Sequence, residues 1–184
     1  MYSKELKNGF VIKEVSQQEL WSALDTHFNE AFSNRTDAKP TWQIDDASKE
    51  KIAGRQQSMV RYHLRLLVYS ADNEVVGWHF GYSTDAETYY MQNSAVLLKY
   101  RNQGVYAEIL TAALEVLGAE GFQVVTSTHH PNNAAVLIPK LKKGFVISSM
   151  LLHERFRLLV ELKYFFSSER RKSFDKQMGL EFNP

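Results

Sequence analysis

A short basic turn from Lys99 to Gly104 carries residue types that bind anions. Arg101 lies within the turn, and Gly104 stands where a helical pattern of apolar residues opens. The first N–H groups of a helix have no partners within the helix, and the helix dipole adds positive charge there. A glycine lets a ligand approach the main chain closely, and an arginine adds a charged hydrogen bond. The turn therefore predicts a phosphate site.

Two common phosphate loops are excluded by the residues around this turn. A single glycine stands where the dinucleotide fingerprint G-x-G-x-x-G requires three. No Gly-Lys-Ser or Gly-Lys-Thr follows, as a Walker A loop would require. An apolar segment over 87–98 precedes the turn and indicates a buried strand, and an apolar stripe that begins at Val105 indicates a helix after it.

This strand, turn and helix resemble the GNAT superfamily of N-acetyltransferases, which carries Arg/Gln-x-x-Gly-x-Gly/Ala at the same place. The matching residues here are Arg101, Asn102, Gln103, Gly104, Val105 and Tyr106. Tyr106 departs from the small residue that the family has, but binding through main-chain N–H groups does not need that side chain. The family also has an asparagine at the start of a later helix that ends in Gly-Phe. Counting back from Gly144 and Phe145 places that asparagine at Asn133, which is also a natural helix N-cap.

The resemblance implies acetyl-CoA as cosubstrate. In the family, the main chain of the turn holds the pyrophosphate, and the splayed end of the preceding strand meets the acetyl and pantetheine groups. The implied contacts are Ser94, Ala95, Val96, Arg101, Asn102, Gln103, Gly104, Val105, Tyr106, Ala107 and Asn133. For the first three we expect ordinary buried-strand side chains, with the function in their main chain. The implied reaction is direct attack of an acceptor amine on the thioester.

Three side chains are candidates for proton transfer. Many family members place a glutamate where Tyr90 stands, and a phenol is a poor base at neutral pH. Others place a glutamate at the position of Thr128, and the adjacent His129 is of a type that titrates in the right range, although a loop histidine with no catalytic part is the alternative. Many use a tyrosine as the acid that protonates the thiolate, and Lys140 occupies that position. An exposed helical lysine is its ordinary interpretation.

Composition narrows the class of protein. A net charge of +1 over 184 residues does not point to nucleic acid or to an anionic membrane. The absence of cysteine excludes a disulfide scaffold and any cysteine-based metal site or nucleophile. The start of the chain lacks the apolar core of a signal peptide, and no apolar run approaches a membrane span. We therefore expect a cytoplasmic location, with no membrane, nucleic-acid or metal partner.

The remaining patterns predict the elements that position the turn. Ser16 and Glu19 form a capping-box signature for a first helix. In GNAT-like proteins the region after that helix lines the acceptor side, so Trp42, Asp45 and Asp46 are candidates for substrate contacts; a solvated loop with an anchoring tryptophan is the alternative. The predicted strands are 10–15, 62–69, 74–83, 87–98, 122–128, 146–152 and 156–166. The strand–helix–strand order across 87–128 requires one parallel pair.

The prediction is a single-domain α/β fold with a GNAT-like mixed, mostly antiparallel central sheet flanked by helices. Residues 1–166 form the acetyltransferase domain, and 167–184 form a tail or an extra helix of it. The function implied is an N-acetyltransferase whose acceptor is a small-molecule or peptide amine. One alternative is a GNAT-fold acyl-CoA sensor without turnover, and another is an interaction protein whose anion site takes a different phosphate ligand or nucleic acid. A homodimer through the last strands is expected because 156–166 can present a free edge.

Overall fold

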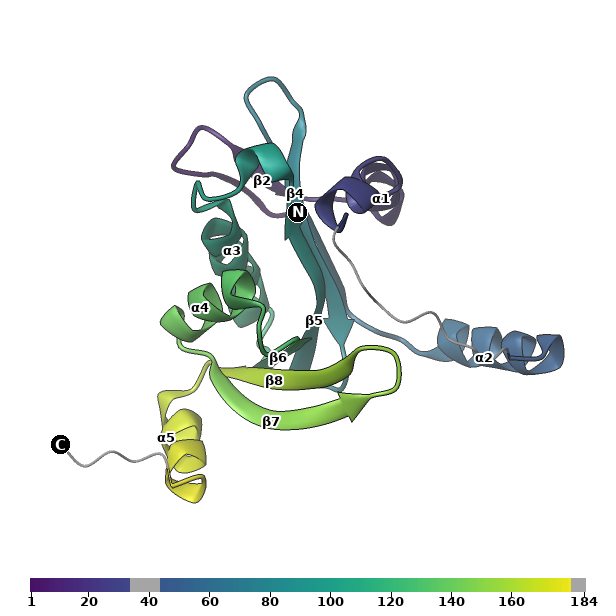
Figure 1. The fold of residues 1–184 in the computed structure, drawn as a ribbon, viewed down its shortest axis with the longest axis vertical. Coiled ribbons are helices and arrows are strands. Elements are labelled where there is room, and N and C mark those ends of the chain that lie inside the picture. The colour runs from purple at the N-terminus through teal and green to yellow at the C-terminus, as the bar shows by residue number, and fades with distance from the viewer. Residues whose placement is uncertain (34–43, 180–184) are drawn as a thin grey trace.

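An eight-stranded sheet with the order β1-β2-β3-β4-β5-β6-β8-β7 forms the centre of the computed structural model, which describes residues 1–33 and 44–179 (Figure 1). Its strands are β1 (Ser3–Glu5), β2 (Val11–Glu14), β3 (His63–Tyr69), β4 (Val75–Ser83), β5 (Thr88–Val96), β6 (Val124–His129), β7 (Val146–His153) and β8 (Arg157–Phe165). Neighbouring strands are antiparallel except for the parallel pair β5 and β6. The predicted fold class is confirmed.

Helices cover both faces of the sheet. They are α1 (Gln17–Ala31), α2 (Asp46–Ser58), the short 3-10 helix η1 (Leu98–Tyr100), α3 (Val105–Ala119), α4 (Ala134–Lys142) and α5 (Ser168–Gln177). Ile109 and Leu117 of α3 belong to one buried core with β3 and β5. Leu20 and Leu24 of α1 pack with Trp78 in a second core on the opposite face. The sheet therefore has an α3/α4 face and an α1 face, and these two names are kept below (Figure 1).

The first helix begins at the capping box that its sequence predicts. The Glu19 N–H donates to Ser16 Oγ at 3.2 Å, and the Ser16 N–H donates to the Glu19 carboxylate at 2.9 Å. Such a cap stabilises a helix by about 1 kcal/mol. From this start, the apolar positions of α1 recur with helical spacing and face Trp78.

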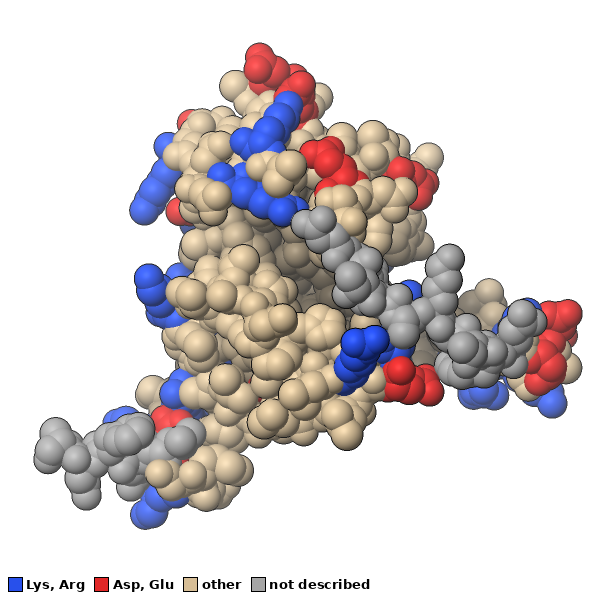
Figure 2. All heavy atoms as spheres, in the orientation of Figure 1, with Lys and Arg blue, Asp and Glu red and all other residues tan. Residues whose placement is uncertain are grey.

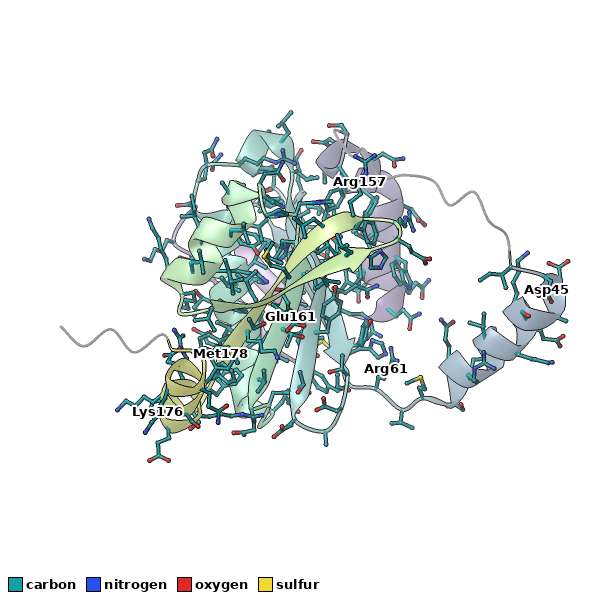
Figure 3. The ribbon with its side chains drawn as sticks, turned by 60° about the horizontal axis from the view of Figure 1, so that its bottom comes forward. Asp45, Arg61, Arg157, Glu161, Lys176 and Met178 are labelled. Carbon is teal, nitrogen blue, oxygen red and sulfur yellow. The ribbon has the colours of Figure 1, made fainter. Side chains whose placement is uncertain are left out.

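The second helix stands away from the sheet. Asp45 caps α2 by accepting a hydrogen bond from the Ser48 N–H at 2.9 Å, and no residue of the helix is buried. Figure 3 shows Asp45 at the outer end of α2, far from the strands. Asp45 and Asp46 are therefore not brought to the sheet, contrary to their expected place among substrate contacts. Trp42 lies outside the described residues.

The last two strands are not in the order that the sequence suggested. If 156–166 had a free edge, β8 would be the outermost strand of the sheet. Strand β8 lies between β6 and β7, and β7 holds the outer position. Leu162 of β8 pairs with Ser127 of β6 and is fully buried on the α3/α4 face. The expectation of a free edge at 156–166 is wrong, because pairing with β6 buries this strand in the sheet interior.

Candidate functional site

The parallel strands β5 and β6 separate after three paired positions. Their pairs are Thr88 with Val124, Tyr89 with Val125, and Tyr90 with Thr126. Beyond these pairs β5 continues beside β4 as far as the pair of Val96 with Gly77, while β6 continues beside β8. A gap therefore opens between the two strands, and the surface is hollowed at its centre in Figure 2, with lysine and arginine side chains above the hollow.

The predicted turn follows directly from the free end of β5. Gly104 is the N-cap of α3 and has φ of +80°, a conformation that glycine adopts without strain. An added Cβ at Gly104 would meet nothing within 4 Å, so the main chain is open there. A cavity of about 230 Å³ adjoins it, between the β1–β2 turn and the start of α3. The first N–H groups of α3 are thus available to an anion.

Tyr106, the departure from the family motif, leaves this turn clear. Its ring packs against the core under α3, and burial raises the pKa of its phenol well above the usual range. Tyr106 is partly buried and Val105 is buried, whereas Asn102, Gln103 and Ala107 are exposed. A bulky residue at this position therefore adds to the core without covering the turn.

Arg101 holds the turn in place. Its Nε donates to the Val96 carbonyl at 3.0 Å, and its Nη2 donates to the Ala31 carbonyl at 2.7 Å. These bonds join the turn to the end of β5 and to the end of α1. The sequence predicted a direct contact from this guanidinium to the anion; in the structure these two donors bond to main-chain carbonyls instead. An anion at this turn would therefore bind chiefly to main-chain N–H groups.

Lys140 occupies the point where β5 and β6 separate. Its side chain is 1% exposed, so its interpretation as an exposed helical lysine is wrong. Nζ donates to Ser127 Oγ at 2.6 Å and to Met91 Sδ at 3.4 Å, and these residues directly follow the last paired positions of the two strands. Nζ also lies 4.9 Å from the centre of the Phe145 ring. Burial lowers the pKa of Lys140 to about 7.

His79 is a site residue that the sequence reasoning did not identify. Its Nδ1 lies 2.8 Å from Ser94 Oγ and its Nε2 lies 3.1 Å from Tyr89 Oη, on the same face of the sheet as Lys140. Burial, with the nearby charge of Lys140, lowers the pKa of His79 to about 3. The only sequence signal was a single polar residue between Trp78 and Phe80 in an apolar strand.

His129 ends β6 and is mostly covered. Within the described part of the chain, its buried Nε2 atom has no hydrogen-bond partner. Burial, together with the charges of Lys140 and His130, lowers the pKa of His129 to about 3. The side chain is therefore neutral across the physiological range. The expectation of a base that titrates near neutral pH is not met.

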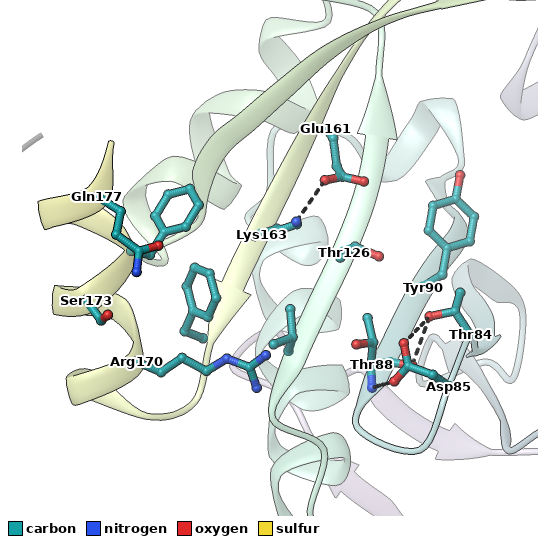
Figure 4. Close-up of a pocket in the computed structure, with 13 residues that line it drawn as sticks. Thr84, Asp85, Thr88, Tyr90, Thr126, Glu161, Lys163, Arg170, Ser173 and Gln177 are labelled. Atoms are coloured by element: carbon teal, nitrogen blue, oxygen red, sulfur yellow. Dashed lines mark hydrogen bonds and ion pairs between the residues drawn. The ribbon is translucent and has the colours of Figure 1, made fainter. Parts of the chain in front are cut away.

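Tyr90 and Thr128 lie on the α1 face, across the sheet from Lys140. The Tyr90 and Thr128 hydroxyls are 2.8 Å apart and join the two strands across the gap. Tyr90 also lines a cavity of about 660 Å³, which α5 closes on one side (Figure 4). Its charged lining includes Glu161 and Lys163, whose carboxylate and amine are 3.4 Å apart. The α1 face thus offers a polar, open surface next to the gap.

Asn133 is the residue before α4, as the motif predicted. Its side chain makes no capping hydrogen bond, so the ordinary structural role of an N-cap asparagine is not performed here. It is half-buried. Its amide is therefore not committed to the helix end.

Comparison with known proteins identifies the family. A model of the acetyltransferase (GNAT) family matches residues 21–139. No curated protein sequence matches the chain. Among solved structures, the ribosomal-protein-S5-alanine acetyltransferase from Vibrio fischeri is similar with a TM-score of 0.68 at 7% identity, covering 91% of this chain and 98% of that one.

Two further structures show the same fold. A mutant form of the spermidine N-acetyltransferase SpeG from Vibrio cholerae has a TM-score of 0.61 at 12% identity, covering 89% of this chain and 98% of that one. The protein yncA from Salmonella typhimurium, solved with its cofactor acetyl-CoA, has a TM-score of 0.62 at 12% identity, covering 86% and 95%. In the described part of the chain, no helix has the length and apolar character to cross a membrane. With the family model covering most of its length, the chain belongs to the GNAT acetyltransferase family.

Proposed function

We propose that the protein is an N-acetyltransferase that moves an acetyl group from acetyl-CoA to an amine. One observation carries this proposal. The gap between β5 and β6 is followed along the chain by the start of α3, where the main chain at Gly104 is open. The end of β5 leads through η1 to Gly104, so one continuous segment provides strand main chain that is no longer paired with β6 and then helix N–H groups. Acetyl-CoA has a thioester at one end and a pyrophosphate farther along, so its binding site must offer donors to both groups. A fold neighbour solved with acetyl-CoA supports the choice of donor.

The residues divide the chemistry between the two faces of the sheet. The acceptor amine approaches in its neutral form from the α1 face, where Tyr90 and Thr128 offer hydroxyls. Main-chain N–H groups of residues 94–96 stabilise the charge that develops on the thioester oxygen. Lys140 then supplies a proton to the leaving thiolate from the α3/α4 face. Its pKa of about 7 leaves a large fraction of the amine protonated at neutral pH.

The acceptor is a small-molecule or peptide amine. The open cavity beside Tyr90 accommodates polar groups of either kind, and the fold alone does not choose between them. A cytoplasmic setting, where acetyl-CoA is made available to such enzymes, is part of this proposal.

A second candidate is an acyl-CoA sensor of the same fold without turnover. It is favoured by the chemistry around the gap, where His79 and His129 both have a pKa of about 3 and are weak bases at neutral pH. The sensor and the enzyme share the acetyl-CoA site. They differ in whether an amine releases free CoA from it.

The test is a calorimetric titration of acetyl-CoA into the wild type, Gly104→Glu and Gly104→Ala. Both variants carry the same left-handed backbone strain, and at neither does the new Cβ meet an atom within 4 Å, so they differ in the carboxylate. We expect the wild type to bind, Gly104→Ala to retain binding, and Gly104→Glu to lose it through repulsion of the phosphates.

Turnover is then measured as thiol release with a panel of amines. Thiol release that depends on an amine establishes the enzyme, and binding without release across the panel establishes the sensor. A folded wild type that does not bind acetyl-CoA, or equal binding by Gly104→Glu, contradicts the proposed site.

A further inference from the structure

Lys140 is a fully buried amine, and the part of the chain that the structure describes places no anionic partner beside it. Within the described residues its contacts are the Ser127 hydroxyl, the Met91 sulfur and the Phe145 ring, and it makes no ion pair. The titratable groups that face it are the imidazoles of His79 from β4 and His129 from β6, both neutral at physiological pH. A buried ammonium normally has a carboxylate beside it, because burial of an isolated charge is costly. This lysine is thus placed to exist in part as a neutral amine.

The amine also lies beside the place that the proposed function assigns to the thioester. Met91 and Ser127 are the first residues of β5 and β6 after the last paired positions, and Nζ bonds to both. Nζ therefore lies at the closed end of the gap between the two strands, on its α3/α4 side. With two N–H bonds donated to Ser127 and Met91, the lone pair of the neutral amine points away from those two contacts.

We propose that Lys140 is itself a modification site, acetylated by the acetyl-CoA bound in its own chain when no acceptor amine is present. The proposal rests on the proposed function, because it requires acetyl-CoA in the gap. It assigns a second acceptor to the site, one that belongs to the protein.

The step balances without a further reactant. The lone pair of Nζ attacks the carbonyl carbon of the thioester, a bond forms between nitrogen and carbon, and the bond between carbon and sulfur breaks. The proton lost from Nζ passes to the departing thiolate, so the products are N-acetyl-lysine and free CoA. The amide is stable, and the modification therefore accumulates.

The modification removes the group that the transfer reaction uses. An acetylated Lys140 has no positive charge and no proton to give to a thiolate, and its added acetyl group occupies the end of the gap. The proposal thus predicts an enzyme that loses activity when it is kept with acetyl-CoA alone and keeps activity when an acceptor amine competes for the acetyl group.

The experiment incubates the full chain with acetyl-CoA alone at neutral pH and follows acetylation of each lysine by peptide mass spectrometry. Lys142 is an internal reference, because it is exposed on the same helix. With a pKa of about 7 against 10.5 for an ordinary lysine, Lys140 has roughly a thousandfold larger neutral fraction at neutral pH. We expect Lys140 to be modified at least tenfold faster than Lys142.

Two variants separate bound acetyl-CoA from free reagent. Gly104→Glu should abolish acetylation of Lys140 and leave the background at Lys142 unchanged. Lys142→Arg should leave acetylation of Lys140 unchanged. Acetyl-CoA binding by a wild type whose Lys140 stays unmodified overturns this inference and leaves the proposed function intact. Equal modification of Lys140 in Gly104→Glu also overturns this inference. If the wild type does not bind acetyl-CoA, both the inference and the proposed function are wrong.

Discussion

The amine of Lys140 lies 2.6 Å from the hydroxyl of Ser127, and this contact joins α4 to β6 at the point where β6 leaves β5. The hydroxyl is neutral, and among the described residues the amine makes no ion pair. Burial lowers the pKa of the amine in the folded chain but not in the unfolded chain, so the free energy of unfolding depends on pH.

Lys140→Met should flatten the stability profile at alkaline pH. The pKa is about 7 in the folded chain and 10.5 in a free lysine, so between these values the unfolded chain holds a proton that the folded chain lacks. The free energy of unfolding of the wild type therefore rises with pH across this window. Below pH 7 the buried amine is charged, and the full cost of burying its charge lowers the stability. Between pH 7 and 9 we expect the wild type to gain about 2 kcal/mol over the variant, measured by urea unfolding. Lys142→Met, at an exposed position, should follow the wild type. Parallel profiles for the wild type and Lys140→Met would show that the amine is not held in a lowered-pKa state.

His79→Gln should have the corresponding effect in acid. The pKa of His79 falls from 6.5 to about 3 on folding, so the unfolded chain binds the extra proton between these values and stability falls as pH drops through them. Glutamine keeps a donor and an acceptor but does not titrate. From pH 6.5 to 5, unfolding experiments should show the wild type losing about 1.5 kcal/mol more than the variant. An identical loss in both proteins would contradict a buried neutral imidazole.

Gly81→Ala should destabilise the sheet beside the site. A Cβ there would lie 2.2 Å from the Tyr90 carbonyl oxygen and 2.5 Å from Tyr89 Oη, and the first of these is main chain that cannot turn away. We expect a loss of about 3 kcal/mol in thermal or urea unfolding. Gly54→Ala is the control, because an added Cβ there meets nothing within 4 Å and alanine favours the helix. It should be neutral or slightly stabilising, and equal losses at the two positions would refute the close approach.

Tyr90→Phe should reduce acetyl transfer without reducing acetyl-CoA affinity. The lost group is one hydroxyl on the acceptor side, worth about 1 kcal/mol, so kcat/KM for the amine should fall about fivefold. Thr128→Val should have a similar effect. Because the two hydroxyls bond to each other, the double variant should lose less than the product of the single effects. A weaker affinity for acetyl-CoA in Tyr90→Phe would place this hydroxyl in the donor site instead.

Local patterns predicted the main-chain features of the site well. A glycine before an apolar stripe indicated the start of α3, and strand–helix–strand order required the parallel pair of β5 and β6. Both depend on residues close in sequence and on chain connectivity. The short β1 had no such pattern, because three residues form a strand only through pairing with β2.

Side-chain environments could not be predicted in the same way. The burial of Lys140 depends on how α4 packs against β5 and β6, which its own helix sequence does not reveal. The partner of Ser94 is His79 on a neighbouring strand, and this contact follows from sheet register. The interior position of β8 likewise depends on its pairing with β6, which is distant in sequence.

The gap between β5 and β6 has a consequence for how such a protein changes over evolutionary time. A binding surface made from peptide groups has no side chain that substitution could delete, and every residue except proline supplies the same N–H. The course of the main chain can then persist while almost all of the side chains along it are replaced. The similar solved structures share this fold at identities of 7% to 17%. The positions most sensitive to substitution are those such as Gly104, whose left-handed φ of +80° favours glycine.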